Sequence, residues 1–123
     1  WWTREVIGAH SSICQSSRTS LGDPFLDVRT VLRDARIASL SPDALEIVCL
    51  FDSGGDGQHE LCSSRRSDMG DALPRPRRIT SLQTVNRPKG TAFGMDGLTL
   101  LILESGQPTR VLRAQRPSLG GNW

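Results

Sequence analysis

Residues 23–52 read DPFLDVRTVLRDARIASLSPDALEIVCLFD and form the one long stretch of the chain in which apolar side chains recur periodically. Asp23 followed by Pro24 is typical of a helix start, because the carboxylate can accept a free amide hydrogen and proline at the first helical position has no amide to leave unpaired. With about 100° per residue, the apolar side chains gather in one arc: Phe25, Val28, Val31, Leu32, Ala35 and Ala38. The sequence therefore predicts an amphipathic helix over about residues 24–40.

A second, shorter apolar element follows over about residues 42–51. Ser41 and Pro42 mark its start, since the residue before a proline is disfavoured in helical geometry and serine is a common helix cap. The element is apolar on nearly all sides, and its β-branched Ile47 and Val48 suit either a short buried helix or a buried strand. The start signal favours the helix, and the strand stays open as the alternative.

Three apolar residues of the expected helix lie outside its apolar arc: Leu26, Ile37 and Leu40. A buried neighbour or a partner chain has to cover them, because apolar surface is removed from water where it can be. The sequence therefore allows an oligomer that forms through these three side chains.

The C-terminal third has the alternating pattern of β-structure. Residues 98–103 (LTLLIL) and 109–114 (TRVLRA) flank a segment that contains glycine and proline, which predicts a β-hairpin. A further strand is expected before the hairpin, over residues 79–85 (ITSLQTV).

The remaining segments have few apolar residues. Residues 52–78 are rich in Gly, Ser, Pro and charge, so we expect a flexible connection there. The tail over residues 115–123 contains proline and glycine and is expected to fray. One helix, a short apolar element, a flexible middle and a C-terminal β-hairpin make a single small α+β domain of 123 residues.

The arginines give the main hint of function. The formal net charge is only +2, which does not by itself favour nucleic acid. On the expected helix, three arginines would share one flank and repel one another unless an anion lies opposite. Three more follow in the flexible segment. The six are Arg29, Arg33, Arg36, Arg75, Arg77 and Arg78. We therefore expect a non-enzymatic binding module whose arginines meet an anionic partner, nucleic acid or an acidic protein surface, without a cofactor.

A small hydrolase that uses Ser53, or a cysteine, together with a histidine is an alternative. Residues 52–55 (DSGG) resemble the nucleophile segment of trypsin-like serine proteases, and His10 precedes Ser53 as in the chain order of that family. Phe51 and Asp56 replace the glycine and proline of that family, and the chain is too short for its two barrels. We therefore interpret residues 52–55 as an acidic turn.

A second resemblance concerns the start of the expected hairpin. Residues 94–101 (GMDGLTLL) are similar to the segment after the phosphorylated aspartate in response-regulator receivers. The likeness implies a helix over residues 97–104 in place of a strand. Lys89 stands where that family has its phosphoacceptor, so no phosphorylation site follows from the likeness.

The chain could also be a sequence without an evolved function. Leu, Ser and Arg are its commonest residues and are also the residues with the most codons. Lysine occurs once, at Lys89, as in GC-rich reading frames. A random, shuffled or out-of-frame sequence would have this composition.

Two short His/Cys pairs form a weak candidate for a zinc site: His10, Cys14, His59 and Cys62. The usual close spacing of zinc ligands is absent, so no metal is assigned. Three cysteines do not form a disulfide framework and favour a reducing intracellular compartment. No segment has the length of a membrane span, so no membrane contact is expected.

Overall fold

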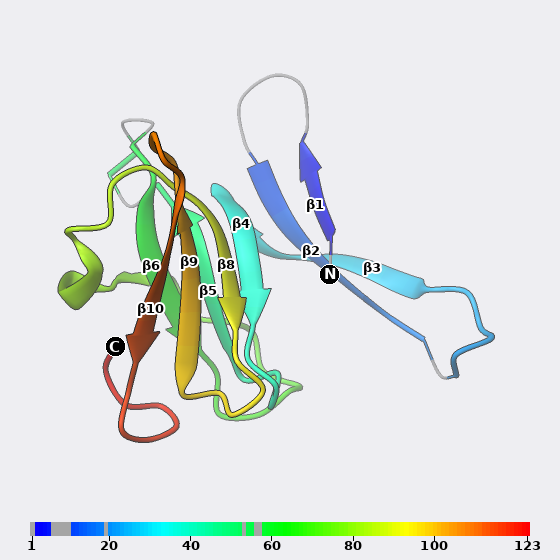
Figure 1. Cartoon of the computed structure of the whole chain (residues 1–123). Helices are drawn as coiled ribbons and strands as arrows, with labels where there is room; N and C mark the ends of the chain where they lie inside the picture. Colours follow the sequence, from blue (N-terminus) through cyan, green and yellow to red (C-terminus); the bar gives the residue numbers. More distant parts are fainter. Residues whose placement is uncertain (1, 6–10, 19, 53, 56–57) are drawn as a thin grey trace.

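The structure, a computed structural model, describes residues 2–5, 11–18, 20–52, 54–55 and 58–123 (Figure 1). This part of the chain forms three antiparallel sheets and one short 3-10 helix, and it contains no α-helix. The expected α+β class is therefore wrong, because the described chain is built from β-strands.

Sheet B lies in the centre of the molecule and has the strand order β4-β5-β6-β7. Its strands are β4 (Ala35–Leu40), β5 (Glu46–Phe51), β6 (Glu60–Arg65) and β7 (Arg77–Arg78). Sheet C, with the order β10-β9-β8, packs against one face of sheet B (Figure 1). Its strands are β8 (Pro88–Phe93), β9 (Thr99–Glu104) and β10 (Arg110–Gln115). The two sheets meet where β4 lies beside β8, with the hydroxyls of Ser39 and Thr91 3.0 Å apart.

Sheet A has the order β1-β2-β3 and extends sideways from the body formed by the other two sheets (Figure 1). Its strands are β1 (Trp2–Glu5), β2 (Ser11–Ser17) and β3 (Leu26–Arg33). The base of this sheet joins the body, since Ile13 and Leu32 are buried. Its distal part is exposed at Leu21, Phe25 and Val28.

Strand β5 is buried along its whole length. Alternate side chains of a strand point to opposite faces, and both faces of β5 enter a hydrophobic core. The first core contains Ile13, Leu32, Ala35, Ile47, Cys49, Phe51, Cys62 and Leu73. The second core contains Val48, Leu50, Leu61, Ile79, Leu100 and Ile102. Both faces of sheet B are covered, which explains why apolar residues follow one another along β5 instead of alternating with polar ones.

The predicted helix over residues 24–40 is wrong, and this segment forms β3 and β4. Val28, Thr30 and Val31 are β-branched and suit a strand that pairs with β2. Asp34 has a φ of 57° and separates the two strands, a conformation that aspartate tolerates better than most residues. Asp23 and Pro24, expected to begin the helix, lie in the connection between β2 and β3.

The second apolar element is a strand, so its favoured helical interpretation is also wrong. The start signal belongs to a turn in which the Ala44 amide donates to the carbonyl of Ser41 at 2.8 Å and Ala44 has a φ of 58°. The apolar residues proposed for an oligomer lie elsewhere than expected. Ile37 packs against the second core and Leu40 against the first, while the side chain of Leu26 lies outside the described residues.

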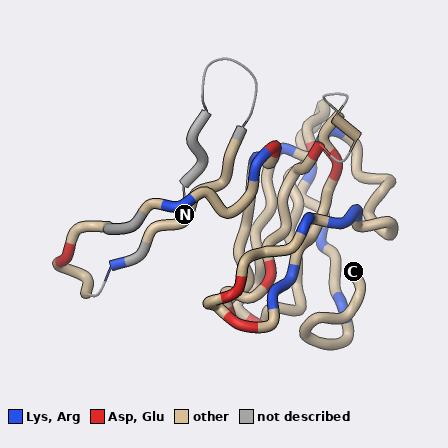
Figure 2. The backbone as a smooth tube through the Cα atoms, turned by 180° about the vertical axis from the view of Figure 1, so that it is seen from behind, with Lys and Arg blue, Asp and Glu red and all other residues tan. Residues whose placement is uncertain are grey.

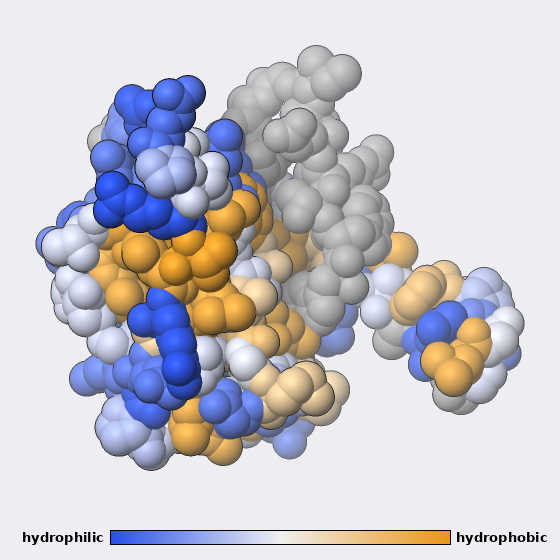
Figure 3. Space-filling view, in the orientation of Figure 1, coloured by the Kyte–Doolittle hydropathy of each residue, from blue (hydrophilic) through white to orange (hydrophobic). Residues whose placement is uncertain are grey.

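A hairpin of β9 and β10 is present near the C-terminus, with Leu103 opposite Val111. The helical alternative over residues 97–104 is wrong, because β9 occupies this range and alternates between the two sides of sheet C. Leu100 and Ile102 are buried, whereas Leu101 and Leu103 are 40% and 38% exposed. They contribute to the apolar surface over β9 and β10 in Figure 3.

Two other segments also differ from expectation. Residues 79–85 do not form a strand but contain the 3-10 helix η1 (Thr80–Leu82). Residues 52–78, expected to be a flexible connection, contain β6 and β7 and contribute Leu61 and Leu73 to the cores. Both segments pair or pack with residues that are distant in sequence, and a composition-based prediction cannot include such partners.

Replacing Leu100 with alanine should lower the free energy of unfolding by about 3 kcal/mol, because its side chain is fully buried and the substitution leaves a cavity. The control is Leu21→Ala on the distal part of sheet A, where leucine is 86% exposed. This control should change the free energy of unfolding by less than about 0.5 kcal/mol. Urea denaturation measures both, and equal effects would contradict the packing of sheet C on sheet B.

Candidate anion-binding groove

A groove of about 1080 Å³ runs along the edge of sheet B, between β6, β7 and the tail over residues 120–123. Four arginines line it: Arg65, Arg75, Arg77 and Arg78. Hydroxyl groups of Ser63, Ser64, Thr80 and Ser81 add hydrogen-bond donors and acceptors. Among the described residues that line the groove, Glu46 has the one acidic side chain. The groove therefore combines several cations with neutral polar groups.

Two prolines fix the backbone before β7. Pro74 and Pro76 flank Arg75, and proline restricts both its own φ and the conformation of the preceding residue. The Ser64 hydroxyl donates to the carbonyl of Pro74 at 2.6 Å, which ties this segment to β6. Pro76 is buried and Arg75 is exposed. The segment therefore presents Arg75 from a restrained backbone.

Strand β7 places its two arginines on opposite faces of sheet B. Arg77 lies opposite Ser63, and cross-strand partners share a face, so Arg77 lies on the face that also carries Arg65. Arg78 lies opposite Cys62 on the other face and forms an ion pair with Glu60 at 3.1 Å. The groove therefore continues around the edge of the sheet.

Arg65 is held by two carboxylates. Its guanidinium lies 3.1 Å from Asp43 and 3.4 Å from Glu46. Partial burial raises the pKa of Asp43, but hydrogen bonds from Ser41 and Leu45 and the Arg65 guanidinium outweigh it, so this pKa lies below its ordinary value. Gly120 has a φ of 74° and lies against the Arg65 side chain, where a Cβ would come within 3.3 Å of Nε.

The tail is attached to sheet B through a buried cluster around Glu46. The Arg116 side chain is fully buried and lies 2.6 Å from Glu46. Arg116 also donates from Nη2 to the carbonyl of Gly97 at 2.8 Å, and Trp123 Nε1 donates to Glu46 at 3.2 Å. These contacts satisfy a carboxylate that is costly to bury alone. They also fix Trp123 as a wall of the groove, although we expected this tail to fray.

The structure brings three of the six predicted arginines together in the groove and separates the other three. Arg29 and Arg33 are exposed on β3, and Arg36 on β4 donates from Nε to His59 Nε2 at 3.0 Å. Their common flank does not exist, since it depended on the helix. Figure 2 shows basic and acidic segments interspersed over the body, so the groove is a local feature rather than part of one basic face.

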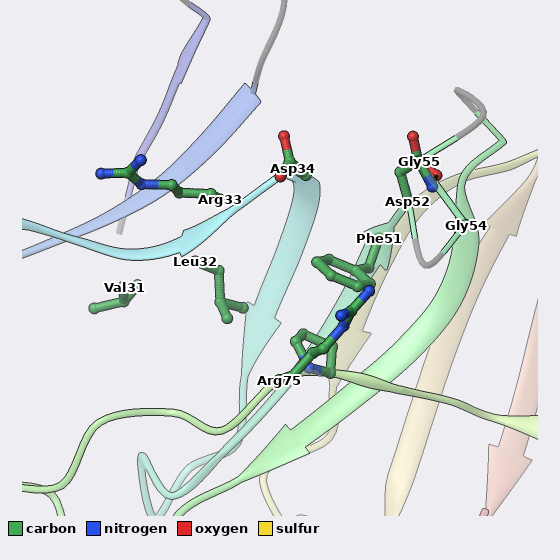
Figure 4. Close-up of a pocket in the computed structure, with 10 residues that line it drawn as sticks. Val31, Leu32, Arg33, Asp34, Phe51, Asp52, Gly54, Gly55 and Arg75 are labelled. Carbon is green, nitrogen blue, oxygen red and sulfur yellow. Dashed lines mark hydrogen bonds between the residues drawn. The ribbon is translucent and has the colours of Figure 1, made fainter.

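A smaller hollow of about 450 Å³ lies near the end of β5 (Figure 4). Arg75 and Pro76 line both this hollow and the groove. The Arg75 guanidinium lies over the Phe51 ring at 5.7 Å from its centroid, and Arg33 extends away from Phe51 (Figure 4). Arg75 therefore stands between the two depressions.

Only some residues of the hydrolase and zinc hypotheses belong to the described part of the chain. His10 and Ser53 lie outside the described residues. Cys14 is buried in sheet A, whereas Cys62 is buried in sheet B directly opposite Cys49. Burial raises the pKa of Cys49 to about 12 and that of Cys62 to about 11, so both thiols are protonated near neutral pH. Within the described part of the chain, no group of three or more His, Cys, Asp or Glu side chains could hold a metal ion.

Sequence reasoning counted Arg65 among the cationic residues of the flexible segment, and it did not assign Arg116 or Trp123 to a site. Arg65 contacts Glu46 across 19 positions of sequence, and Trp123 contacts the same residue across 77. No local motif marks such pairs. The one available signal was the alternation of proline and arginine before β7, which did point to one wall of the groove.

Comparisons with family models, with curated proteins and with solved structures found no match. No helix in the described residues is long and apolar enough to cross a membrane. The function of the chain therefore has to be inferred from the residues that line the groove.

Replacing Arg116 with leucine should lower the free energy of unfolding by about 3 kcal/mol, because it removes the closest partner of a buried carboxylate. Arg113 is exposed on β10, so Arg113→Leu should change stability by less than about 0.5 kcal/mol. Thermal or urea unfolding of both variants tests the cluster. A stable Arg116→Leu variant would mean that the tail is not held through Glu46.

Cys49 and Cys62 should resist thiol reagents in the folded protein at about pH 8, because both are buried and protonated. The unfolded chain ionises its thiols near pH 9.0 while the folded chain keeps these protons, so the free energy of unfolding should fall between pH 9.0 and about 11. Labelling with and without denaturant, followed by peptide mass spectrometry, checks the first statement. Rapid labelling of either residue in the folded state would contradict this and would support a hydrolase with a cysteine nucleophile.

Proposed function

We propose that this chain is a non-enzymatic binding module that holds a polyanion in the groove along the edge of sheet B. The observation that carries the proposal is the set of four arginines around one groove. Arg65 and Arg78 also pair with carboxylates, and Glu46, the acidic side chain in the lining, is itself paired with the buried Arg116. Guanidinium groups bind phosphates and carboxylates through paired hydrogen bonds. The hydroxyls of Ser63 and Thr80 can supply further donors for the same oxygens, whereas those of Ser64 and Ser81 already donate to backbone carbonyls.

The shape of the groove supports a chain-like ligand over a small molecule. Pockets for small ligands have volumes of about 300–1000 Å³ and are mostly apolar and enclosed. This groove has a volume of about 1080 Å³, at the upper end of that range, but its lining is rich in charged and polar residues and it continues around the edge of the sheet. An extended polymer with regularly spaced negative charges can contact arginines on both faces of β7.

The hydrolase alternative has less support from the described residues. A cysteine nucleophile reacts as the thiolate, whereas the pKa values of Cys49 and Cys62 are raised by burial. His59 accepts a hydrogen bond from Arg36, and neither residue lines the groove.

The triple variant Arg75→Gln, Arg77→Gln, Arg78→Gln should lose most of its affinity for a labelled oligothymidine of about 12 nucleotides and for inorganic polyphosphate. If all three arginines contact phosphates, the slope of log K against log salt should fall by about 2. Fluorescence anisotropy from about 50 to 200 mM salt measures both quantities.

The matched control replaces Arg29, Arg33 and Arg36 with glutamine. This variant has the same change in net charge but keeps the groove, so it should bind nearly as well as the unchanged chain. Equal losses in the two triple variants would show that only net charge matters. Salt-independent or absent binding to both probes would contradict the proposed function.

A further inference from the structure

The groove has an aromatic wall as well as a cationic one. Trp123 lines it, and the Trp123 ring is held on several sides by its neighbours. Its Nε1 donates to Glu46, the Arg116 guanidinium lies over the ring at 4.3 Å from the centroid, and the Phe93 ring centroid lies 5.6 Å away at a tilt of 59°. Trp123 is partly exposed and belongs to the lining of the groove. The ring is therefore fixed in orientation before any ligand binds.

From this arrangement we infer that the polyanion is a single-stranded nucleic acid, one base of which stacks on Trp123 while neighbouring phosphates contact the groove arginines. The inference rests on the proposed polyanion binding and adds the recognition of a base. Cationic grooves with aromatic stacking surfaces bind single strands with little dependence on sequence, because every base has a flat π-face. Arg77 and Arg65 lie on the same face of sheet B, the face of the second core, to which Trp123 packs.

Other polyanions would use only part of the groove. Polyphosphate and acidic peptides can contact the arginines, but they offer no base to the Trp123 ring. A duplex keeps its bases stacked inside, where a ring at the wall of a groove cannot reach them without extrusion of the nucleotide. A single strand is the polyanion that matches both walls.

The test compares oligothymidine of about 12 nucleotides with an abasic oligodeoxynucleotide of equal length, which has the same phosphates and no bases. The unchanged chain should bind oligothymidine about 10-fold more tightly than the abasic strand. In Trp123→Leu this ratio should fall close to one, and in Trp123→Phe, which keeps a stacking ring, it should persist. A polyglutamate competitor should displace oligothymidine no better than the abasic strand does.

Fluorescence gives a second measurement that does not depend on the stability of the Trp123 variants. In a chain with Trp1→Phe and Trp2→Phe, Trp123 is the remaining tryptophan, since the chain has three. Its emission should be quenched by oligothymidine and not by the abasic strand.

Equal binding of the two strands by the unchanged chain, or equal quenching by both, would overturn base stacking and leave polyanion binding intact. A ratio that persists in Trp123→Leu would also overturn it, since the base would then stack elsewhere. Stronger competition by polyglutamate would assign the groove to an acidic protein. If neither strand nor polyphosphate binds, the proposed function itself fails.

Discussion

Strand β5 has no face toward solvent, and the two cores of the protein form on its opposite sides. Ile47, Cys49 and Phe51 belong to the first core, and Val48 and Leu50 to the second. Sheet C, the base of sheet A and the segment around Leu73 therefore each share a hydrophobic core with this six-residue strand. Only 37% of the residues are apolar. A strand that is buried on both faces contributes to two cores, so fewer apolar residues are needed to form them.

The sequence indicated a short apolar element over about residues 42–51 and the hairpin of β9 and β10. It favoured a helix for that element and for residues 24–40, and both form strands. The reason lies in the irregularity of the strands. Pairing shifts register twice between β2 and β3 and once between β4 and β5. Each shift interrupts the two-residue alternation of a strand and so hides the β-pattern. Phe25 and Val28 complete the helical spacing although both side chains are exposed. Local periodicity therefore cannot distinguish irregular strands from a helix.

The candidate site was predictable in one part. Arg75, Arg77 and Arg78 stand out because prolines separate and extend them, and the structure places them in the groove. The arginines of the expected helix flank are dispersed over β3 and β4, since the helix that aligned them does not form. Arg65 and Trp123 join the groove through Glu46, a contact between distant parts of the chain that only the fold creates.

The burial of β5 on both faces also leaves its alignment with β4 and β6 weakly specified by hydrophobicity. A slip by one residue normally moves apolar side chains into water, which penalises the wrong alignment. Here a slipped β5 would exchange the contents of the two cores and still bury them. Glu46 at the start of the strand removes this ambiguity, because a slip would carry its carboxylate away from Arg116 and Trp123. The ion pair between Glu46 and Arg116 thus also favours one alignment of β5 over alignments that would bury a similar apolar surface.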